Sequence, residues 1–398
     1  MKYNGIVIAD VHVGAFDINK LNNEYQKIFI DYIKTLDSLD FLIIDGDFFD
    51  RKFYLNDKES VMAYHMLQSL FDVCKPLKTK IRIVYGTESH ECNQYDVLSI
   101  MDLYDDIKVI KSAQSEELLP DLNVLYLPEE YMDNKDEFYK ELFSDTYDYV
   151  FGHGIIREAM TKAVASMKAK GEDKRKKVPI FSSKELSDIC TGEVYFGHYH
   201  INSEMDGNVY YVGSFSRWEF GQEERKGFYK LSCNTEKKRY KSEFIENTLA
   251  DKFVTISYGY NSSIFDSGDV DNVALESTLS NIDKQIDNKI FEHVRFEFNI
   301  PSDCSKPEGL IQYVKERYKF NDNVKVNFVN GYVEDKKAKK KEAIKKENDE
   351  YSFIFDTSLN ISDKCSKFIE ITYNENIPKD RIDSYLNEDI NEILSRLT

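Results

Sequence analysis

Histidine and aspartate residues gather in this sequence where short apolar runs end. The strings IADVH, IIDGDFFD, VYGTESHE, VFGHG and VYFGHYH supply eight candidate side chains: Asp10, His12, Asp47, Asp50, His90, His153, His198 and His200. Imidazoles and carboxylates that cluster away from water need partners. A mixture of the two without cysteine suits Mn, Fe or Zn better than Mg or Ca. The residue types therefore predict a centre for divalent metal ions.

The apolar runs that would position these residues are typical of strands in an α/β fold. A 3.6-residue apolar period predicts helices near 21–36 and 61–71. In an open α/β sheet, the loops after the strand carboxyl ends share one rim, so loops distant in sequence would meet there. We expect strands over Ile6–Ala9, Phe41–Asp45, Ile81–Tyr85, Val124–Leu127, Asp148–Phe151, Glu193–Phe196, Val209–Val212 and Gly227–Leu231.

The sequence after this α/β region changes character twice. Alternating strand and helix patterns over 250–332 predict a small α/β cap domain that follows a main domain at 1–245. A lysine-rich run in 333–350 is typical of a charged linker or a solvated helix. Residues 351–398 carry two amphipathic helical patterns, and so short a segment cannot bury both stripes alone. We expect this helical tail to dock on this chain or on a partner.

Composition excludes several classes of protein. The chain has 398 residues, a formal net charge of −18 and six scattered cysteines. It contains no apolar run long enough to cross a membrane and no signal-peptide core. We therefore expect a cytoplasmic protein with reduced thiols.

The negative charge also limits how this chain could bind a polyanion. An acidic chain is not attracted to nucleic acid by its overall field, so it would need metal ions, a local basic stretch or a partner. Residues 162–177 form such a stretch, which ends in Lys174, Arg175, Lys176 and Lys177. This stretch is either a solvated loop or a contact for a phosphate backbone.

Taken together and in order, the motifs DVH, GDFFD, GTESHE, GHG and GHYH resemble those of calcineurin-like metallophosphoesterases. The string YVGSFSRWEFGQEERKGFY at 211–229 is similar to the end of the nuclease domain in SbcD-type DNA repair nucleases. The resemblance implies a sandwich of two sheets flanked by helices, followed by a cap domain and a helical tail. It also implies two divalent metal ions, with Mn most suitable, DNA as substrate, an SbcC-type ATPase bound by the tail, and a homodimer formed through the nuclease domain. Short viral members have the same organisation, so the cytoplasm could be that of a host cell.

The resemblance also implies a role for each motif residue. Asp10, His12 and His200 would hold one metal, and Asp47 would bridge both. His153 and His198 would hold the second metal, while His90 would protonate or steady the leaving oxygen. Asp50 would orient a ligand from behind, or else cap a helix N-terminus.

One ligand departs from the family pattern. The usual motif is GNHD or GNHE, in which the asparagine binds the second metal. Here Ser89 precedes the histidine after a two-residue insertion, so Ser89 or Thr87 would supply a hydroxyl, directly or through water. Alternatively, Glu88 could turn inward and supply a carboxylate.

These expectations favour one function over two others. The preferred one is a Mn-dependent DNA nuclease, the subunit of an SbcCD-like repair and recombination complex, which cleaves phosphodiester bonds as an exonuclease or endonuclease. The first alternative is a calcineurin-like phosphoesterase for nucleotides or phosphoproteins. The second is a scaffold without catalysis. The absence of a P-loop and of a GxSxG string disfavours nucleotide binding through a P-loop and serine hydrolase chemistry.

Overall fold

The fold is given by a computed structural model. It describes residues 1–54, 57–100, 106–159, 178–258, 264–266, 269–288, 292–299, 307–319 and 321–329, together with Asp363 and Ser366. The basic residues 174–177, the linker 333–350 and nearly all of the tail 351–398 lie outside the described residues. One compact unit comprises Met1–Thr255 with Lys284–Arg295, and the remaining chain contributes a second.

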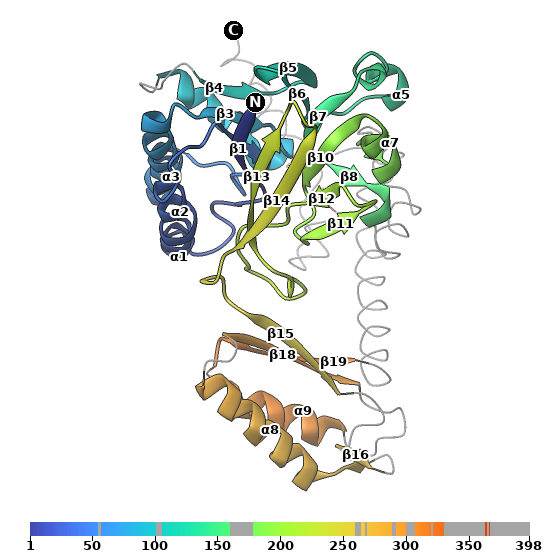
Figure 1. The fold of residues 1–398 in the computed structure, drawn as a ribbon. Coiled ribbons are helices and arrows are strands. Elements are labelled where there is room, and N and C mark those ends of the chain that lie inside the picture. Colours follow the sequence, from blue (N-terminus) through green and yellow to red (C-terminus); the bar gives the residue numbers. More distant parts are fainter. Residues whose placement is uncertain are drawn as a thin grey trace. The chain divides into compact units, whose positions relative to one another are not determined.

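A mixed six-stranded sheet forms one half of the first unit (Figure 1). Strands β1 to β4 run parallel, β13 pairs antiparallel with β1, and β14 pairs antiparallel with β13. All carboxyl ends of the parallel strands therefore reach the same edge. In spatial order the strands are β14 (Arg239–Glu246), β13 (Gly227–Asn234), β1 (Lys2–Ile8), β2 (Phe41–Asp45), β3 (Lys80–Val84) and β4 (Ile107–Ile110).

A second six-stranded sheet forms the other half. Its central strands β12, β10, β7 and β6 are parallel, and its two edge strands are antiparallel to their neighbours. In spatial order the strands are β11 (Ser203–Met205), β12 (Val209–Tyr211), β10 (Cys190–Gly197), β7 (Tyr147–His153), β6 (Leu122–Leu127) and β5 (Gln114–Leu119). A short parallel pair, β8 (Ile155–Ile156) with β9 (Ile180–Phe181), lies outside both sheets.

The two sheets pack face to face through apolar side chains. Val7 and Ile43 of the first sheet share one buried cluster with Tyr149, Phe151 and Tyr195 of the second. Because alternate residues of a strand point to opposite faces, the other face of each sheet needs its own cover. Ile6 and Ile8 pack with the helices after β1 and β2, and Val150 packs with those beside β10.

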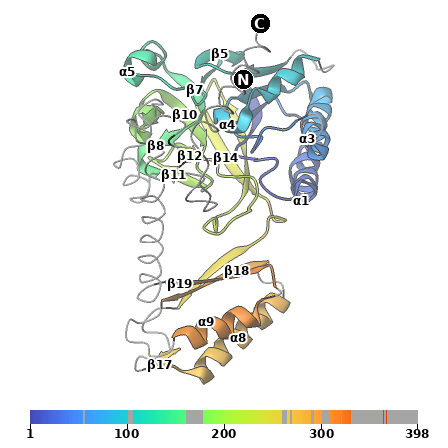
Figure 2. The same ribbon diagram turned by 180° about the vertical axis from the view of Figure 1, so that it is seen from behind.

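Helices therefore lie outside both sheets (Figure 2). Those over the first sheet are α1 (Ile18–Glu24), η1 (Tyr25–Ile30), α2 (Asp31–Lys34), α3 (Lys58–Cys74) and η2 (Lys75–Leu77). The remaining helices of this unit are α4 (Glu88–Glu91), η3 (Gln94–Ile100), α5 (Lys135–Phe138), η4 (Leu142–Ser144), η5 (Arg157–Ala159) and α7 (Ser183–Asp188). The predicted α/β class is confirmed, in the form of mixed sheets flanked by helices and compatible with a two-sheet sandwich.

The strands expected from the sequence are confirmed. Each of the eight expected strands is present in the first unit. The expected helix near 21–36 is interrupted, because a π-helical stretch, η1, separates α1 from α2. A 3.6-residue apolar period cannot reveal such a widened turn, since η1 still buries Tyr25, Phe29 and Ile30.

A smaller sheet follows in sequence, in the order β15 (Phe253–Tyr258), β18 (His293–Asn299) and β19 (Val324–Val329). It is accompanied by α8 (Asn272–Asp287), α9 (Pro307–Arg317) and a two-stranded ribbon of β16 (Phe265–Asp266) with β17 (Asp269–Val270). Alternate residues of β18 and one stripe of α8 are buried: Val294, Phe296, Phe298, Leu275, Leu279 and Ile282. No helix within the described chain is both long enough and apolar enough to cross a bilayer.

Candidate metal centre

The loops that follow β1 and β2 are joined by backbone hydrogen bonds at the centre of the site. The Asp10 N–H donates to the Gly46 carbonyl at 3.2 Å, and the His12 N–H donates to the Asp47 carbonyl at 3.0 Å. Asp10, His12 and Asp47 have φ values of 48°, 51° and 47°, a region that residues with a Cβ rarely occupy. Such conformations persist where the surrounding structure enforces them, and they cluster at functional sites.

Gly46 shows why the second loop contains a glycine. Its φ is 81°, and a Cβ at this position would lie 2.0 Å from Nδ1 of His153. The imidazole of His153 therefore reaches the loop after β2 only because position 46 has no side chain.

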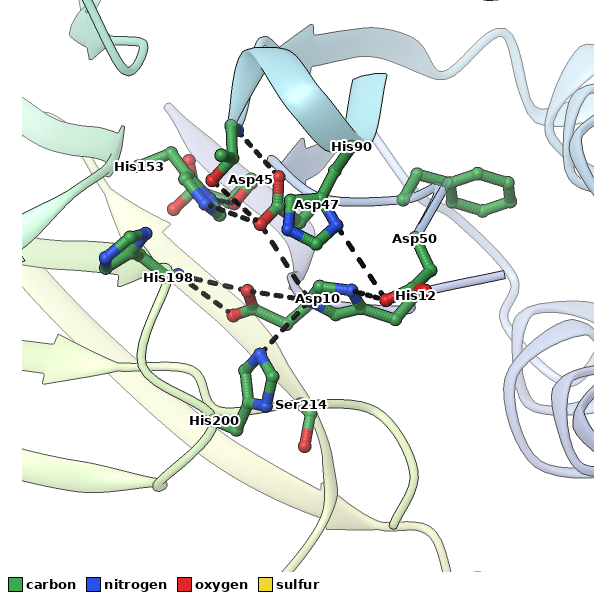
Figure 3. A network of polar contacts seen from close by, with 12 residues as sticks. Asp10, His12, Asp45, Asp47, Asp50, His90, His153, His198, His200 and Ser214 are labelled. Carbon is green, nitrogen blue, oxygen red and sulfur yellow. Dashed lines mark hydrogen bonds and ion pairs between the residues drawn. The ribbon is translucent and has the colours of Figure 1, made fainter. Parts of the chain in front are cut away.

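The first ligand group consists of Asp10, His12 and His200. Nε2 of His12 lies 3.1 Å from Nε2 of His200 and 3.7 Å from Oδ1 of Asp10. The three potential ligand atoms all lie within 4.8 Å of one another. These are the residues expected to hold the first metal, and the structure brings them together (Figure 3).

The second ligand group consists of His153, His198 and Glu129, again with all three atoms within 4.8 Å. Nδ1 of His198 lies 3.2 Å from Oε2 of Glu129. Nε2 of His153 is buried and makes no hydrogen bond within the described chain. A buried nitrogen that faces carboxylates without a hydrogen bond is an orphaned donor or acceptor, and a metal ion would satisfy it.

Asp47 lies between the two groups. Its Oδ2 is 3.8 Å from Nε2 of His12 and 3.2 Å from Nε2 of His153. One carboxylate therefore faces an imidazole from each group, the position that the expected bridging role requires. Asp10 contributes to both sides as well, because its carboxylate accepts the His198 backbone N–H at 3.0 and 3.1 Å.

In three of the imidazoles, the ring nitrogen Nδ1 contacts a polar group of the surrounding protein. Nδ1 of His12 lies 2.9 Å from Oδ1 of Asp50, and Nδ1 of His153 lies 2.9 Å from the Asp45 carbonyl. Nδ1 of His200 lies 3.0 Å from the Gln222 side-chain amide. Contacts of this kind fix the orientation of a metal-binding imidazole. Asp50 therefore has the expected supporting position, and the helix N-cap nearby is Asp57 instead.

The string at 211–229 reaches the site through its aromatic residue. Trp218, the one tryptophan of the sequence, lies with its ring centroid 5.1 Å from that of His12 and 5.0 Å from that of His200. Lys226 of the same string is buried and donates to the His200 carbonyl at 2.6 Å. This segment thus supports the first ligand group.

His90 lies in α4 and forms a further group with His12 and Asp50, whose potential ligand atoms all lie within 4.8 Å of one another. Its ring is perpendicular to that of His12 at a centroid distance of 5.0 Å, and its Nδ1 is 3.8 Å from Oδ1 of Asp50. The side chain is about one-third exposed, at 31%. His90 therefore lies beside the potential metal ligands and is open to solvent.

The loop before His90 differs from the expectation for Ser89. The side chains of Glu88 and Ser89 are exposed, and Thr87 is the residue of this loop that contacts the site carboxylates. Its N–H donates to Oδ1 of Asp47 at 2.7 Å, and its hydroxyl lies 3.1 Å from Oδ2 of Asp47 and 3.0 Å from Oε2 of Glu129. The two-residue insertion shifts the motif register, so Thr87 faces inward.

Burial and neighbouring charges set the protonation of the metal-free site. Burial raises the pKa of Glu129, but the contacts with His198 and His153 outweigh it and lower the pKa to about 2. Burial lowers the pKa of His12, but the carboxylates of Asp10 and Asp50 raise it to about 9. Burial dominates at His200 and lowers its pKa to about 4. The site is therefore rich in ionised carboxylates.

Glu129 is the functional candidate that sequence reasoning missed. It follows Pro128 directly after β6, at the same sheet edge as the other ligands. The available signal was a carboxylate at the carboxyl end of a predicted strand, without any accompanying motif. By contrast, Lys174, Arg175, Lys176 and Lys177 lie outside the described residues.

Comparison with known proteins adds nothing to this geometry, since neither a family model nor a curated protein matches the sequence. Five loops from two sheets bring imidazoles and carboxylates to one edge, in two groups with Asp47 between them. This donor set fits a pair of divalent transition-metal ions.

Proposed function

We propose that this protein is a metal-dependent phosphodiesterase of the calcineurin-like class that acts on DNA, as the nuclease subunit of an SbcCD-like complex. The observation that carries the proposal is the position of Asp47, whose Oδ2 faces His12 on one side and His153 on the other. Two dications roughly 3.5–4 Å apart require an anion between them. Mn is the cofactor that best matches the mixed imidazole and carboxylate donors.

The residues of the site have separable roles in such a reaction. When bound, two metal ions would lower the pKa of a water and clamp the attacking and leaving oxygens. Asp10, His12, His200 and Asp47 would hold one ion, while Asp50 keeps the His12 ring in place through the 2.9 Å contact at Nδ1. Asp47, His153 and His198 would hold the other.

His90 would act on the leaving oxygen. Its ring is about one-third exposed and lies beside His12, which suits a proton donor that is not a ligand. Asp50 lies 3.8 Å from Nδ1 of His90 and 2.9 Å from Nδ1 of His12. A single carboxylate would thus orient both the proton donor and a ligand.

DNA is favoured as substrate because the string at 211–229 is similar to the end of the nuclease domain in SbcD-type nucleases. In the structure this string supports the first ligand group through Trp218 and Lys226. Because the net charge is −18, the contacts that bind DNA must come from a local basic segment or from a partner. We assign these contacts to Lys174–Lys177 and to an SbcC-type ATPase bound by the tail 351–398, with a homodimer formed through the nuclease domain. A phosphoesterase for nucleotides or phosphoproteins is the alternative, since the same ligand groups would serve it.

The test is a cleavage panel with the full-length protein and Mn. The substrates are supercoiled plasmid, linear duplex, single-stranded DNA, nucleoside monophosphates and a phosphopeptide. We expect DNA to be cleaved, and excess chelator to abolish cleavage. Turnover of mononucleotides or phosphopeptide alone would favour the alternative, and DNA cleavage that persists in chelator would overturn the proposal.

A further inference from the structure

We infer that Glu129 is the fourth protein ligand of the second metal, in the place that the family pattern gives to an asparagine. This inference rests on the proposed function, because it assumes that the two ligand groups hold metal ions. It assigns the ligand to β6 and its following loop, outside every motif that carried the resemblance. Thr87 then becomes a positioning residue.

The first argument is the placement of the Glu129 carboxylate. Its Oε2 lies 3.2 Å from Nδ1 of His198, and together with His153 it completes a set of three ligand atoms within 4.8 Å. Nε2 of His153 is buried without a hydrogen bond in the described chain, so this set contains an orphaned ligand atom. A cation bound here would satisfy all three groups at once.

The second argument is the cost of burying Glu129. The residue is only 7% exposed, and no lysine or arginine of the described residues forms an ion pair with it. Tyr131 donates its hydroxyl to Oε1 at 2.8 Å, which leaves Oε2 directed toward the site. A buried carboxylate is stable only when it is paired or coordinates a metal, and the groups that the described chain places beside Glu129 are the imidazoles of His198 and His153.

The third argument comes from Thr87. Its hydroxyl lies 3.1 Å from Oδ2 of Asp47 and 3.0 Å from Oε2 of Glu129. A threonine hydroxyl carries one proton and can donate to one carboxylate at a time. A cation between the two carboxylates that approach this hydroxyl would stabilise both, and the hydroxyl is suited to orient them toward it.

A carboxylate ligand changes the expected balance of the two sites. With a neutral hydroxyl at Ser89 or Thr87, the second site would be the weaker one. With Glu129, each site has two carboxylates within reach: Asp10 and Asp47 for the first, Asp47 and Glu129 for the second. Since an anionic ligand binds a dication more strongly than a neutral oxygen does, we expect the second site to retain its metal about as well as the first.

The experiment is calorimetric titration of Mn into chelator-treated, full-length protein. We expect two equivalents for wild type and one for Glu129→Ala. Glu129→Gln keeps a neutral carbonyl ligand and should bind the second equivalent at least roughly tenfold more weakly. Thr87→Val should bind both equivalents, with the second weakened by roughly 10- to 100-fold.

Glu130→Gln is the matched control. Its carboxylate is next in sequence but accepts the Ala113 N–H at 2.9 Å, away from the site, and glutamine keeps that acceptor. It should bind as wild type does. If Glu129→Ala does not fold by circular dichroism, Glu129→Gln decides the question alone.

The outcomes distinguish a failure of the Glu129 assignment from a failure of the proposed function. Two unchanged equivalents in both Glu129 variants would overturn the inference and leave the proposed function intact. Loss of one equivalent in Ser89→Ala or Glu88→Ala, with Glu129→Gln unaffected, would transfer the role to that loop. A wild-type protein that binds no Mn would overturn the proposed function itself.

Discussion

The two halves of the site are built differently although they lie side by side. The half around His12 takes its candidate ligands from two short motifs, DVH and GHYH, and each of its imidazoles has a partner at the other ring nitrogen: Asp50 for His12 and Gln222 for His200. The half around His153 combines the ends of three parallel strands of the second sheet, β6, β7 and β10. Its carboxylate comes from a loop without a motif. The His12 half of this candidate metal site can therefore be recognised from sequence motifs, whereas the His153 half is defined by the fold.

Asp47 is the side chain on which both halves depend, so its substitution should have the largest effect. We expect Asp47→Asn to reduce DNA cleavage to the level of chelator-treated protein, because an amide cannot offset the repulsion between two dications. Mn-dependent plasmid cleavage provides the measurement. Asp206→Asn, in the exposed turn between β11 and β12, is the control and should be as active as wild type. An Asp47→Asn enzyme with more than a few per cent activity would break the idea of a shared carboxylate.

His90 should separate chemistry from metal binding. We expect His90→Ala to bind two Mn equivalents while its turnover falls by roughly 10² to 10⁴, the range of general acid–base catalysis. His153→Ala, by contrast, should lose an equivalent because its Nε2 faces Asp47 at 3.2 Å. Parallel calorimetry and steady-state kinetics test this pair. Loss of metal in His90→Ala would make it a ligand.

Substitution of Asp50, which contacts Nδ1 of His12, should affect Mn binding only in the half around His12. We expect Asp50→Asn to weaken one of the two Mn equivalents by roughly 10- to 100-fold, as is usual for residues that orient a metal-binding imidazole. The other equivalent should keep its affinity, since the His153 ring is held by the Asp45 carbonyl instead. The same titration provides the readout. Equal weakening of both equivalents would show that the two halves cannot be treated separately.

The smallest expected effect is a pH dependence within the first half. The pKa of His12 is raised to about 9 in the metal-free protein, so this imidazole is protonated at pH 7. The pKa of His200 is lowered to about 4, so His200 is already neutral there. Because a metal binds the neutral imidazole, we expect about one proton to be released for each Mn ion that binds at this site. The affinity of the site for Mn should then rise by about tenfold per pH unit from 7 toward 9.

Calorimetry in buffers of different ionisation enthalpy measures that proton release. The metal-free fold should respond in the opposite direction: the stabilisation from protonated His12 is complete below its ordinary pKa of 6.5 and is lost as the pH rises through about 9. Binding without proton release at pH 7 would mean that His12 is not a ligand.

Much of this site could be predicted because strand ends and short motifs are local features. The apolar runs before Asp10, Asp47 and His198 located β1, β2 and β10, and the shared edge of parallel strands then implied that their loops meet. The choice between Thr87, Glu88 and Ser89 could not be made from the sequence, because it depends on how a two-residue insertion is accommodated above Asp47. Glu129 could not be predicted either, since its role depends on β6 lying next to β7 in the second sheet.

The central claim is that two metal ions share Asp47, and electron paramagnetic resonance of the Mn-loaded, full-length protein tests it most directly. At two equivalents of Mn we predict the spectrum of an exchange-coupled Mn(II) pair in wild type. Asp47→Asn and Glu129→Ala should each give only the spectrum of isolated Mn(II). A wild-type protein that binds two equivalents but shows only isolated ions would contradict the account.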